Sequence, residues 1–293
     1  MNIMDRLSGS EIRDIAFRTI GQRENSYWKE LRMGKLTASN FGLAVRILRN
    51  KRPKDITELR ARIHHPRSLD NIPAVRWGIT NEARAIEEFK EVTGAHVRPT
   101  GLWMFRNNYM GASPDGIIYA DDVSQKPLGI IEVKCPYSLR DITSDDTYEW
   151  VNQLPYMDSN RQLKKDHDYY HQIQGTMYAV GVPWCDFIIW TPGSLYFHRI
   201  KKDPEWAKYI PALEDLYSDR LQRDELGDST DSEEEKKRER GWGRHGQKSR
   251  WFGDLMRMED VNAILHHPTA AFEEHRFYVM QCFQIHLGRW IYL

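Results

Sequence analysis

The chain has 293 residues, of which 40% are hydrophobic and 12% aromatic, as in a folded globular protein. It contains no apolar run long enough for a membrane span, and its first residues lack the apolar segment of a secretory signal. Its 3 cysteines are widely spaced, which favours neither a disulfide framework nor a Cys-X-X-Cys metal site. We therefore expect an intracellular protein without a membrane partner, located in the cytoplasm or, in a eukaryotic host, in the nucleus.

The formal net charge is zero, from 42 basic and 42 acidic side chains. The basic residues are unevenly distributed, because residues 1–54 hold 12 Lys and Arg against 5 acids. A local basic surface can bind phosphates even where the whole chain is neutral. Charge alone is equally consistent with a set of solvated helix faces.

The first helix is expected after Ser8 or Ser10, which can cap it, and a second is expected to begin at Thr37 or Ser39. Arg32 precedes the second helix. A guanidinium, hydroxyl groups and free backbone N–H groups at one helix N-terminus indicate either an anion site or an ordinary capped helix. Residues 53–73 have weak signals and are interpreted as a loop or a short helix.

Residues 75–93 show a strong helical pattern that Gly94 ends. Glu82 follows Ile79 by three positions and precedes Ile86 by four, so it is expected to point inward with the apolar stripe. An inward carboxylate needs a partner. Glu82 is therefore either a candidate metal ligand or a buried acid paired with an arginine.

Two short strings predict a metal site. Asp115, in Ser-Pro-Asp-Gly, precedes an apolar strand at 116–119, and residues 128–134 form a second strand that contains Glu132 and Lys134. Side chains alternate along a strand, so Glu132 and Lys134 share a face, and a hairpin would bring Asp115 close to them. Two adjacent carboxylates favour a hard divalent cation. Taken singly, the strings are also typical of a turn and of a surface ion pair.

The other expected elements complete a mixed α/β pattern. Gly181 should end a helix on which Tyr169 and Gln172 share one side, and His171 on that helix is either a packing residue or a metal ligand. The remaining predictions are a strand or hairpin at 95–105 with a turn at Asn107 and Asn108, helical or irregular structure at 137–165, the start of the helix just described at Asp166 or Asp168, strands at 183–190 and 195–200, and a helix at 203–220.

The composition changes sharply after residue 220. An acidic run followed by Lys and Arg is typical of a solvated linker. We therefore predict a domain at 1–220, a charged and flexible linker at 221–260, and an appendage of unknown role at 261–293.

Together these strings resemble the PD-(D/E)XK nucleases of the phage lambda exonuclease type, also called the YqaJ viral recombinase family. The resemblance covers roughly residues 27–200 and implies an α/β fold with a restriction-endonuclease-like core, in which helices flank a central mixed β-sheet. Five strings occur in the family's order: Arg32 with Thr37-Ala38-Ser39, Trp77-Gly-Ile-Thr-Asn-Glu-Ala83, Ser113-Pro-Asp-Gly116, Glu132-Val-Lys-Cys-Pro136, and Tyr169 with Gln172-Ile-Gln174.

The resemblance implies a role for each matched residue. Asp115 and Glu132 would bind the metal, Glu82 would be a further or water-mediated ligand, and the Val133 carbonyl would supply another oxygen. Lys134 would orient or activate the attacking water. The remaining roles are those of Gln172, which would help to hold the lysine and the nucleophile, and of Arg32 and Ser39, which would bind a terminal 5′-phosphate.

The implied function is a DNA exonuclease that requires Mg²⁺, replaceable by Mn²⁺, and uses two ions for phosphodiester hydrolysis. Its substrate would be double-stranded DNA digested 5′→3′ from 5′-phosphorylated ends, in recombination, replication or repair. A single-strand annealing protein is a possible partner, and relatives include both trimers and monomers. An endonuclease of the same fold and a non-catalytic DNA-end-binding protein are the alternatives.

Overall fold

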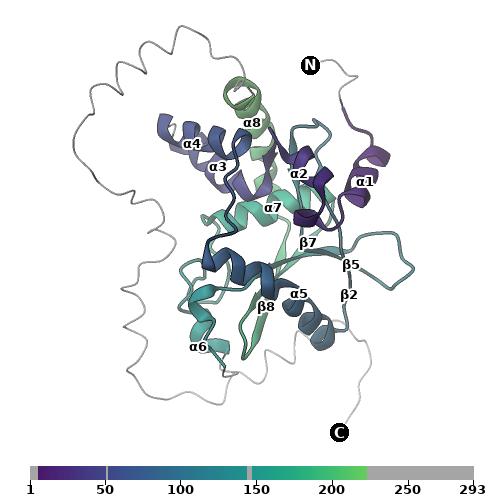
Figure 1. The fold of residues 1–293 in the computed structure, drawn as a ribbon, viewed down its shortest axis with the longest axis vertical. Helices are drawn as coiled ribbons and strands as arrows, with labels where there is room; N and C mark the ends of the chain where they lie inside the picture. The colour runs from purple at the N-terminus through teal and green to yellow at the C-terminus, as the bar shows by residue number, and fades with distance from the viewer. Residues whose placement is uncertain (1–5, 51, 144–146, 223–293) are drawn as a thin grey trace, which may run out of the picture. The chain divides into compact units, whose positions relative to one another are not determined.

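The computed structural model describes residues 6–50, 52–143 and 147–222 (Figure 1). These residues belong to a first unit, Met1–Gly227, and a second unit consists of Asp228–Leu293. The predicted appendage at 261–293 and all but the first two residues of the predicted linker lie outside the described residues. The last buried side chain of the described part is Leu221.

Helices contain more of the described residues than strands do. Of the two candidate caps, Ser8 caps the first helix in a capping box, since Ser8 accepts a hydrogen bond from the Glu11 N–H and the Glu11 side chain accepts one from Ser8. The α-helices are α1 (Gly9–Arg18), α2 (Ser26–Arg32), α3 (Phe41–Asn50), α4 (Pro53–His64), α5 (Pro73–Thr93), α6 (Thr147–Val151), α7 (Asp168–Val180) and α8 (Tyr209–Leu216). Short helical turns are η2 (Gln22–Glu24), η3 (Ala38–Asn40), η4 (Tyr137–Leu139), η5 (Pro204–Lys208) and η6 (Tyr217–Leu221).

The strands form two sheets. The larger has the order β2-β5-β6-β7-β8 and the smaller has the order β1-β4-β3. The strands are β1 (Leu36–Thr37), β2 (His96–Arg98), β3 (Trp103–Met104), β4 (Met110–Ala112), β5 (Gly116–Tyr119), β6 (Gly129–Lys134), β7 (Trp184–Trp190) and β8 (Leu195–Lys201).

Strand β6 lies at the centre of the larger sheet. It pairs antiparallel with β5, which confirms the predicted hairpin, and parallel with β7. Parallel neighbours require a crossover connection, and α7 lies in it (Figure 1). Strands β7 and β8 then form a second antiparallel pair.

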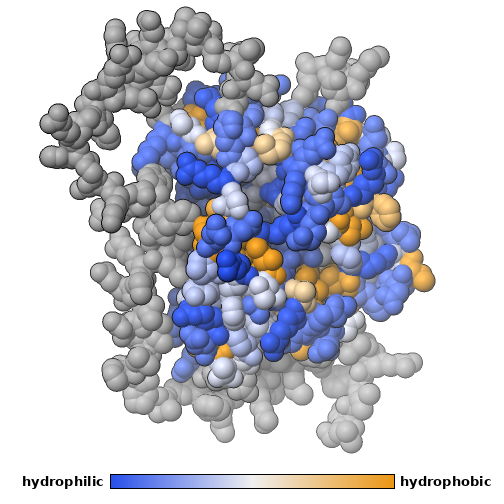
Figure 2. All heavy atoms as spheres, viewed as in Figure 1, coloured by the Kyte–Doolittle hydropathy of each residue, from blue (hydrophilic) through white to orange (hydrophobic). Residues whose placement is uncertain are grey.

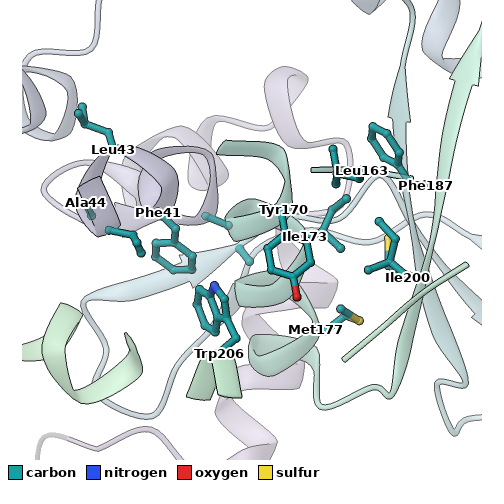
Figure 3. Close-up of a cluster of buried hydrophobic side chains, with 14 of the residues drawn as sticks. Phe41, Leu43, Ala44, Leu163, Tyr170, Ile173, Met177, Phe187, Ile200 and Trp206 are labelled. Atoms are coloured by element: carbon teal, nitrogen blue, oxygen red, sulfur yellow. The ribbon is translucent and has the colours of Figure 1, made fainter. Parts of the chain in front are cut away.

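Helices cover both faces of this sheet. Ile130 of β6 packs in the core that contains residues of α3 and α7. The next residue, Ile131, packs in the core that contains residues of α5. Figure 3 shows Ile173 and Met177 of α7 between Phe41 and the sheet strands that carry Phe187 and Ile200. This mixed sheet with helices on each side is the restriction-endonuclease-like α/β architecture that the sequence predicts.

Two sequence-based expectations differ from the structure. Residues 53–64 form a full α-helix, because Pro53 occupies a first-turn position and three buried apolar residues, Ile56, Leu59 and Ile63, recur at helical spacing. Helix α5 extends over the expected residues, but of the expected apolar stripe it packs Ile86 and Phe89 and leaves Ile79 at the surface. Ala85 and Phe89 are enclosed while Ile79 is 38% exposed.

The described surface is predominantly hydrophilic. In the view of Figure 2, hydrophobic residues gather in patches across the middle of the face, between hydrophilic regions. Within residues 6–50, 52–143 and 147–222, the helices are too short or too polar to cross a lipid bilayer.

Candidate active site

The β5–β6 hairpin places Asp115 against the backbone of β6. Its N–H donates to the Ile131 carbonyl oxygen at 3.3 Å, and its carboxylate Oδ2 accepts a hydrogen bond from the Val133 N–H at 2.7 Å. The Pro-Asp-Gly turn is therefore more than a chain reversal. It holds a carboxylate beside the strand that carries Glu132 and Lys134.

Glu132 is buried at 2% exposure and forms two short contacts through one oxygen. Its Oε1 accepts hydrogen bonds from Lys134 Nζ and from Gln172 Nε2, each at 2.5 Å. Lys134 Nζ also lies 4.6 Å from the centre of the Tyr169 ring, a cation–π distance. The structure thus brings Glu132, Lys134 and Gln172 together, with Tyr169 on the α7 side.

The charges of this cluster influence one another strongly. Burial raises the pKa of Asp115 well above its ordinary value, and the charges of Glu132 and Glu82 raise it further. Burial alone would lower the pKa of Lys134, but Glu132, Tyr169 and Asp115 outweigh it, so the pKa is raised. The lysine therefore stays protonated in the metal-free chain.

Glu82 differs from its predicted orientation. Its side chain is exposed, not directed inward with an apolar stripe, because Trp77, Ala85 and Phe89 supply the packed side of α5 instead. Large aromatic side chains gain more from burial than Ile79 does. Local burial and then the charge of Glu132 nevertheless raise the pKa of Glu82, so its carboxylate interacts electrostatically with the same cluster.

The cluster fits a hard divalent cation by its donors. In the described chain the hydrogen bonds to Asp115 and Glu132 use one oxygen of each carboxylate, Oδ2 and Oε1, so a second oxygen of each can bind an ion. The described residues do not hold three His, Cys, Asp or Glu side chains already gathered as ligands. A cation would therefore have to draw Glu82, or backbone oxygen such as that of Val133, toward the pair.

Arg32 forms the centre of a second cluster. Its Nη2 donates to Thr37 Oγ1 at 3.3 Å, and the Thr37 and Ser39 hydroxyl oxygens are 3.3 Å apart. Burial, and then the charge of Arg23, lower the pKa of Arg32 to about 10. Within the described residues no carboxylate lies within ion-pair distance of Arg32. A half-buried guanidinium beside two hydroxyl groups is a suitable site for an anion.

Trp28 connects the two clusters. The guanidinium carbon of Arg32 lies 4.0 Å from the centre of the Trp28 ring, and Trp28 Nε1 donates to Ser113 Oγ at 2.9 Å. Ser113 is two residues before Asp115. Neither Trp28 nor Ser113 has a role predicted from the sequence. An aromatic residue four positions before Arg32, on the same side of a helix, is the signal that could have suggested this stacking.

His171 has a packing role. It is 3% exposed, and its Nδ1 accepts a hydrogen bond from Trp206 Nε1 at 3.1 Å. Burial and the nearby positive charge of Arg49 lower its pKa to about 4. His171 is therefore neutral, and of the two interpretations that the sequence left open the structure supports packing.

Comparison with known proteins assigns the class of the domain. The model of the YqaJ-like viral recombinase domain matches residues 27–183, which is more than half of the chain. The match contains every residue of both clusters. The chain belongs to the YqaJ-like viral recombinase domain family.

The sequence identities to individual relatives are low. The chain is 23% identical over 232 residues to the alkaline nuclease of Orgyia pseudotsugata multicapsid polyhedrosis virus, covering 72% of this chain and 51% of that protein. It thus spans about half the length of this curated relative. Among solved structures, an alkaline exonuclease from Laribacter hongkongensis is 22% identical, covers 73% of this chain and 97% of its own, and has a TM-score of 0.49. A phage-related exonuclease from Haemophilus somnus 129PT is 12% identical, covers 68% and 96%, and has a TM-score of 0.48.

Proposed function

We propose that the chain is a metal-dependent exonuclease that hydrolyses phosphodiester bonds of double-stranded DNA, 5′→3′ from 5′-phosphorylated ends. The observation that carries the proposal is the connection of two sites. A carboxylate and lysine cluster suited to hydrolysis is joined, through Trp28, to an arginine without an acidic partner among the described residues. Membership of the YqaJ-like family and the name of the viral relative, an alkaline nuclease, support a nuclease.

The reaction adds water to a backbone phosphorus, and the bond to the 3′-oxygen breaks. Asp115 and Glu132 would hold Mg²⁺, or Mn²⁺ in its place, with the Val133 carbonyl and Glu82 as further oxygen ligands for what we propose to be two ions. Bound divalent ions supply activation of the water and neutralisation of the leaving oxygen.

The protein side chains position the reactants. Lys134 is raised in pKa and therefore protonated, so in the metal-free chain it can orient a water or a phosphate oxygen but cannot remove a proton. Gln172 donates to the same Glu132 oxygen as Lys134, which keeps the carboxylate and the ammonium in one arrangement. Asp115 is oriented by the Val133 N–H.

The second cluster would bind the DNA end. Arg32 can donate two parallel hydrogen bonds to a terminal phosphate, and Ser39 and Thr37 offer hydroxyl groups beside it. Because Trp28 contacts both Arg32 and Ser113, which is two residues before Asp115, a phosphate bound at Arg32 would lie at a set distance from the carboxylates. This supports digestion that begins at a 5′-phosphorylated end, within recombination, replication or repair and with a single-strand annealing protein as a candidate partner.

The test uses linear and closed circular duplex DNA, with Mg²⁺, Mn²⁺ or EDTA, and 5′ ends that carry either phosphate or hydroxyl. We expect linear, phosphorylated DNA to be digested only with metal, and Lys134→Ala to lose at least about a hundredfold in rate. Asp141→Asn is the matched control, because that carboxylate is 82% exposed. Efficient cutting of circles would favour an endonuclease, and binding of ends without cutting would favour a non-catalytic end-binding protein.

A further inference from the structure

The short turn between α1 and α2 is held in place by hydrogen bonds from Gln22 to distant parts of the chain. Gly21 and Gln22 both have left-handed backbone conformations, with φ of 88° and 42°, and glutamine rarely adopts one. The Gln22 side chain is fixed across the fold, since its Nε2 donates to the carbonyl oxygens of Pro114 at 2.9 Å and Thr100 at 3.2 Å. The turn is thereby attached to the residue that immediately precedes Asp115.

The residue that this turn presents is Arg23. Its only ion pair in the described chain is with Asp70, at 3.7 Å, and the two side chains are 50% and 75% exposed. An exposed pair at this distance is weak and easily exchanged. The Asp70 backbone carbonyl accepts a hydrogen bond from Arg76 Nε at 3.2 Å. Arg76 belongs to α5, the helix that carries Glu82.

Arg23 follows Gln22, whose side chain donates to the carbonyl oxygen of Pro114, the residue before Asp115. The positive charge of Arg23 also reaches the Arg32 guanidinium, whose pKa is lowered first by burial and then by this charge. Two arginines that repel each other across an open surface are arranged for a ligand with more than one negative charge. A nucleic-acid strand, with one phosphate per nucleotide, has that character.

We propose that Arg23 binds an internal phosphodiester of the DNA strand whose end is held at Arg32, and that Asp70 pairs with Arg23 until DNA displaces it. This inference rests on the proposed function and deepens it. A guanidinium can exchange a single, exposed carboxylate contact for a two-point contact with a phosphate. The Gln22 side chain already fixes the turn through its hydrogen bond to Pro114, so less conformational entropy is lost when DNA binds.

The test measures equilibrium binding of a 5′-phosphorylated duplex in EDTA, where no hydrolysis occurs, as a function of salt. For Arg23→Gln and Arg23→Ala we expect about tenfold weaker binding and a plot of log K against log salt that is less steep by about 0.9, the loss of one phosphate contact. Arg18→Ala is the matched control. Arg18 is equally exposed, at 56%, and pairs with Asp14 on α1 at 3.5 Å. We expect it to bind as the parent does.

Asp70→Asn tests the exchange directly. Removal of the competing carboxylate should tighten binding about two- to threefold in the parent background and have no effect in Arg23→Gln. A salt dependence unchanged in Arg23→Gln would overturn the phosphate contact, and an Asp70→Asn effect that persists in Arg23→Gln would overturn the exchange. Both results presuppose a parent chain that binds DNA. A parent that neither binds nor cuts DNA would instead overturn the proposed function.

Discussion

Asp115→Asn should stabilise the metal-free protein while it abolishes hydrolysis. Asparagine keeps the shape of the side chain and an oxygen that can accept the Val133 N–H, which is bonded at 2.7 Å. What disappears is a charge that burial, Glu132 and Glu82 all disfavour, as the raised pKa of Asp115 shows. Removal of the Asp115 charge would therefore cause both the stabilisation and the loss of activity.

The magnitude follows from electrostatics. Carboxylates about 5–8 Å apart at an effective dielectric constant of about 20 repel by roughly 2–3 kcal/mol. Replacing a charged acceptor with a neutral one at Val133 costs back about 1 kcal/mol. The net gain in the free energy of unfolding is therefore about 1–2 kcal/mol, or roughly 3–6 °C in Tm for a domain of this size.

The pH dependence has a definite sign. A carboxyl whose folded pKa is raised above the ordinary value of 3.8 favours folding at acid pH, and this contribution is lost as pH rises through the folded pKa. The advantage of Asp115→Asn over the parent should therefore be largest near pH 8 and vanish near pH 4. Mg²⁺ should narrow the gap at pH 8, because it stabilises only the parent.

Thermal unfolding by circular dichroism, with EDTA or Mg²⁺ across this pH range, measures both effects, with Asp141→Asn as the exposed control. Equal unfolding midpoints for Asp115→Asn and the parent at pH 8 in EDTA would refute the reasoning, since they would mean that the carboxylates do not crowd one another.

Three further predictions concern other parts of the described chain. Arg32→Ala should reduce the preference for 5′-phosphorylated over hydroxyl ends by about 10- to 100-fold, because one charge-assisted hydrogen bond contributes about that much. A competition digest measures this preference, and an unchanged ratio would remove Arg32 from end recognition. Because burial lowers the pKa of His171 from 6.5 to about 4, its contribution to stability is complete above pH 6.5 and lost as pH falls toward 4. His171→Asn should flatten urea-measured stability over that range by about 1–3 kcal/mol, and an equally steep fall in the variant would contradict this. Asp186 is 3% exposed and accepts bonds of 2.8 and 2.9 Å from Arg199. Asp186→Ala should therefore lose about 3–5 kcal/mol of unfolding free energy in a urea titration, whereas a loss below 1 kcal/mol would show that Arg199 finds water instead.

The sequence predicted much of the sheet, and it predicted which charged side chains of β6 lie on the same face. Alternation in β6 is a local property, so Glu132 and Lys134 could be placed on one side of a strand without knowledge of the fold. The hairpin to Asp115 required only a neighbouring strand and a loop of suitable length. For the same reason the helix that bears Gln172 could be delimited by its glycine stop, although its contact with Glu132 joins residues 40 positions apart.

What the sequence did not reveal depends on tertiary packing. The orientation of Glu82 was predicted from a helix stripe, yet the side that α5 buries is decided by where Trp77 and Phe89 meet the sheet. The Trp28 to Ser113 hydrogen bond spans 85 positions, and no local pattern encodes such a pairing. The assignment of roles to Asp115, Glu132, Lys134, Gln172, Val133, Glu82, Arg32 and Ser39, and the division of the chain at residues 220 and 260, remain predictions.

The stacking of Arg32 on Trp28 has a consequence for the products of the reaction. One indole ring contacts the Arg32 guanidinium on its face and the loop of Asp115 through its N–H. On the proposed function, this single rigid side chain would fix the distance between the DNA end bound at Arg32 and the phosphodiester bond that is hydrolysed near Asp115. On the proposed function, each round of hydrolysis would release fragments of one uniform length, whatever the base sequence, and Trp28→Leu would broaden that length distribution.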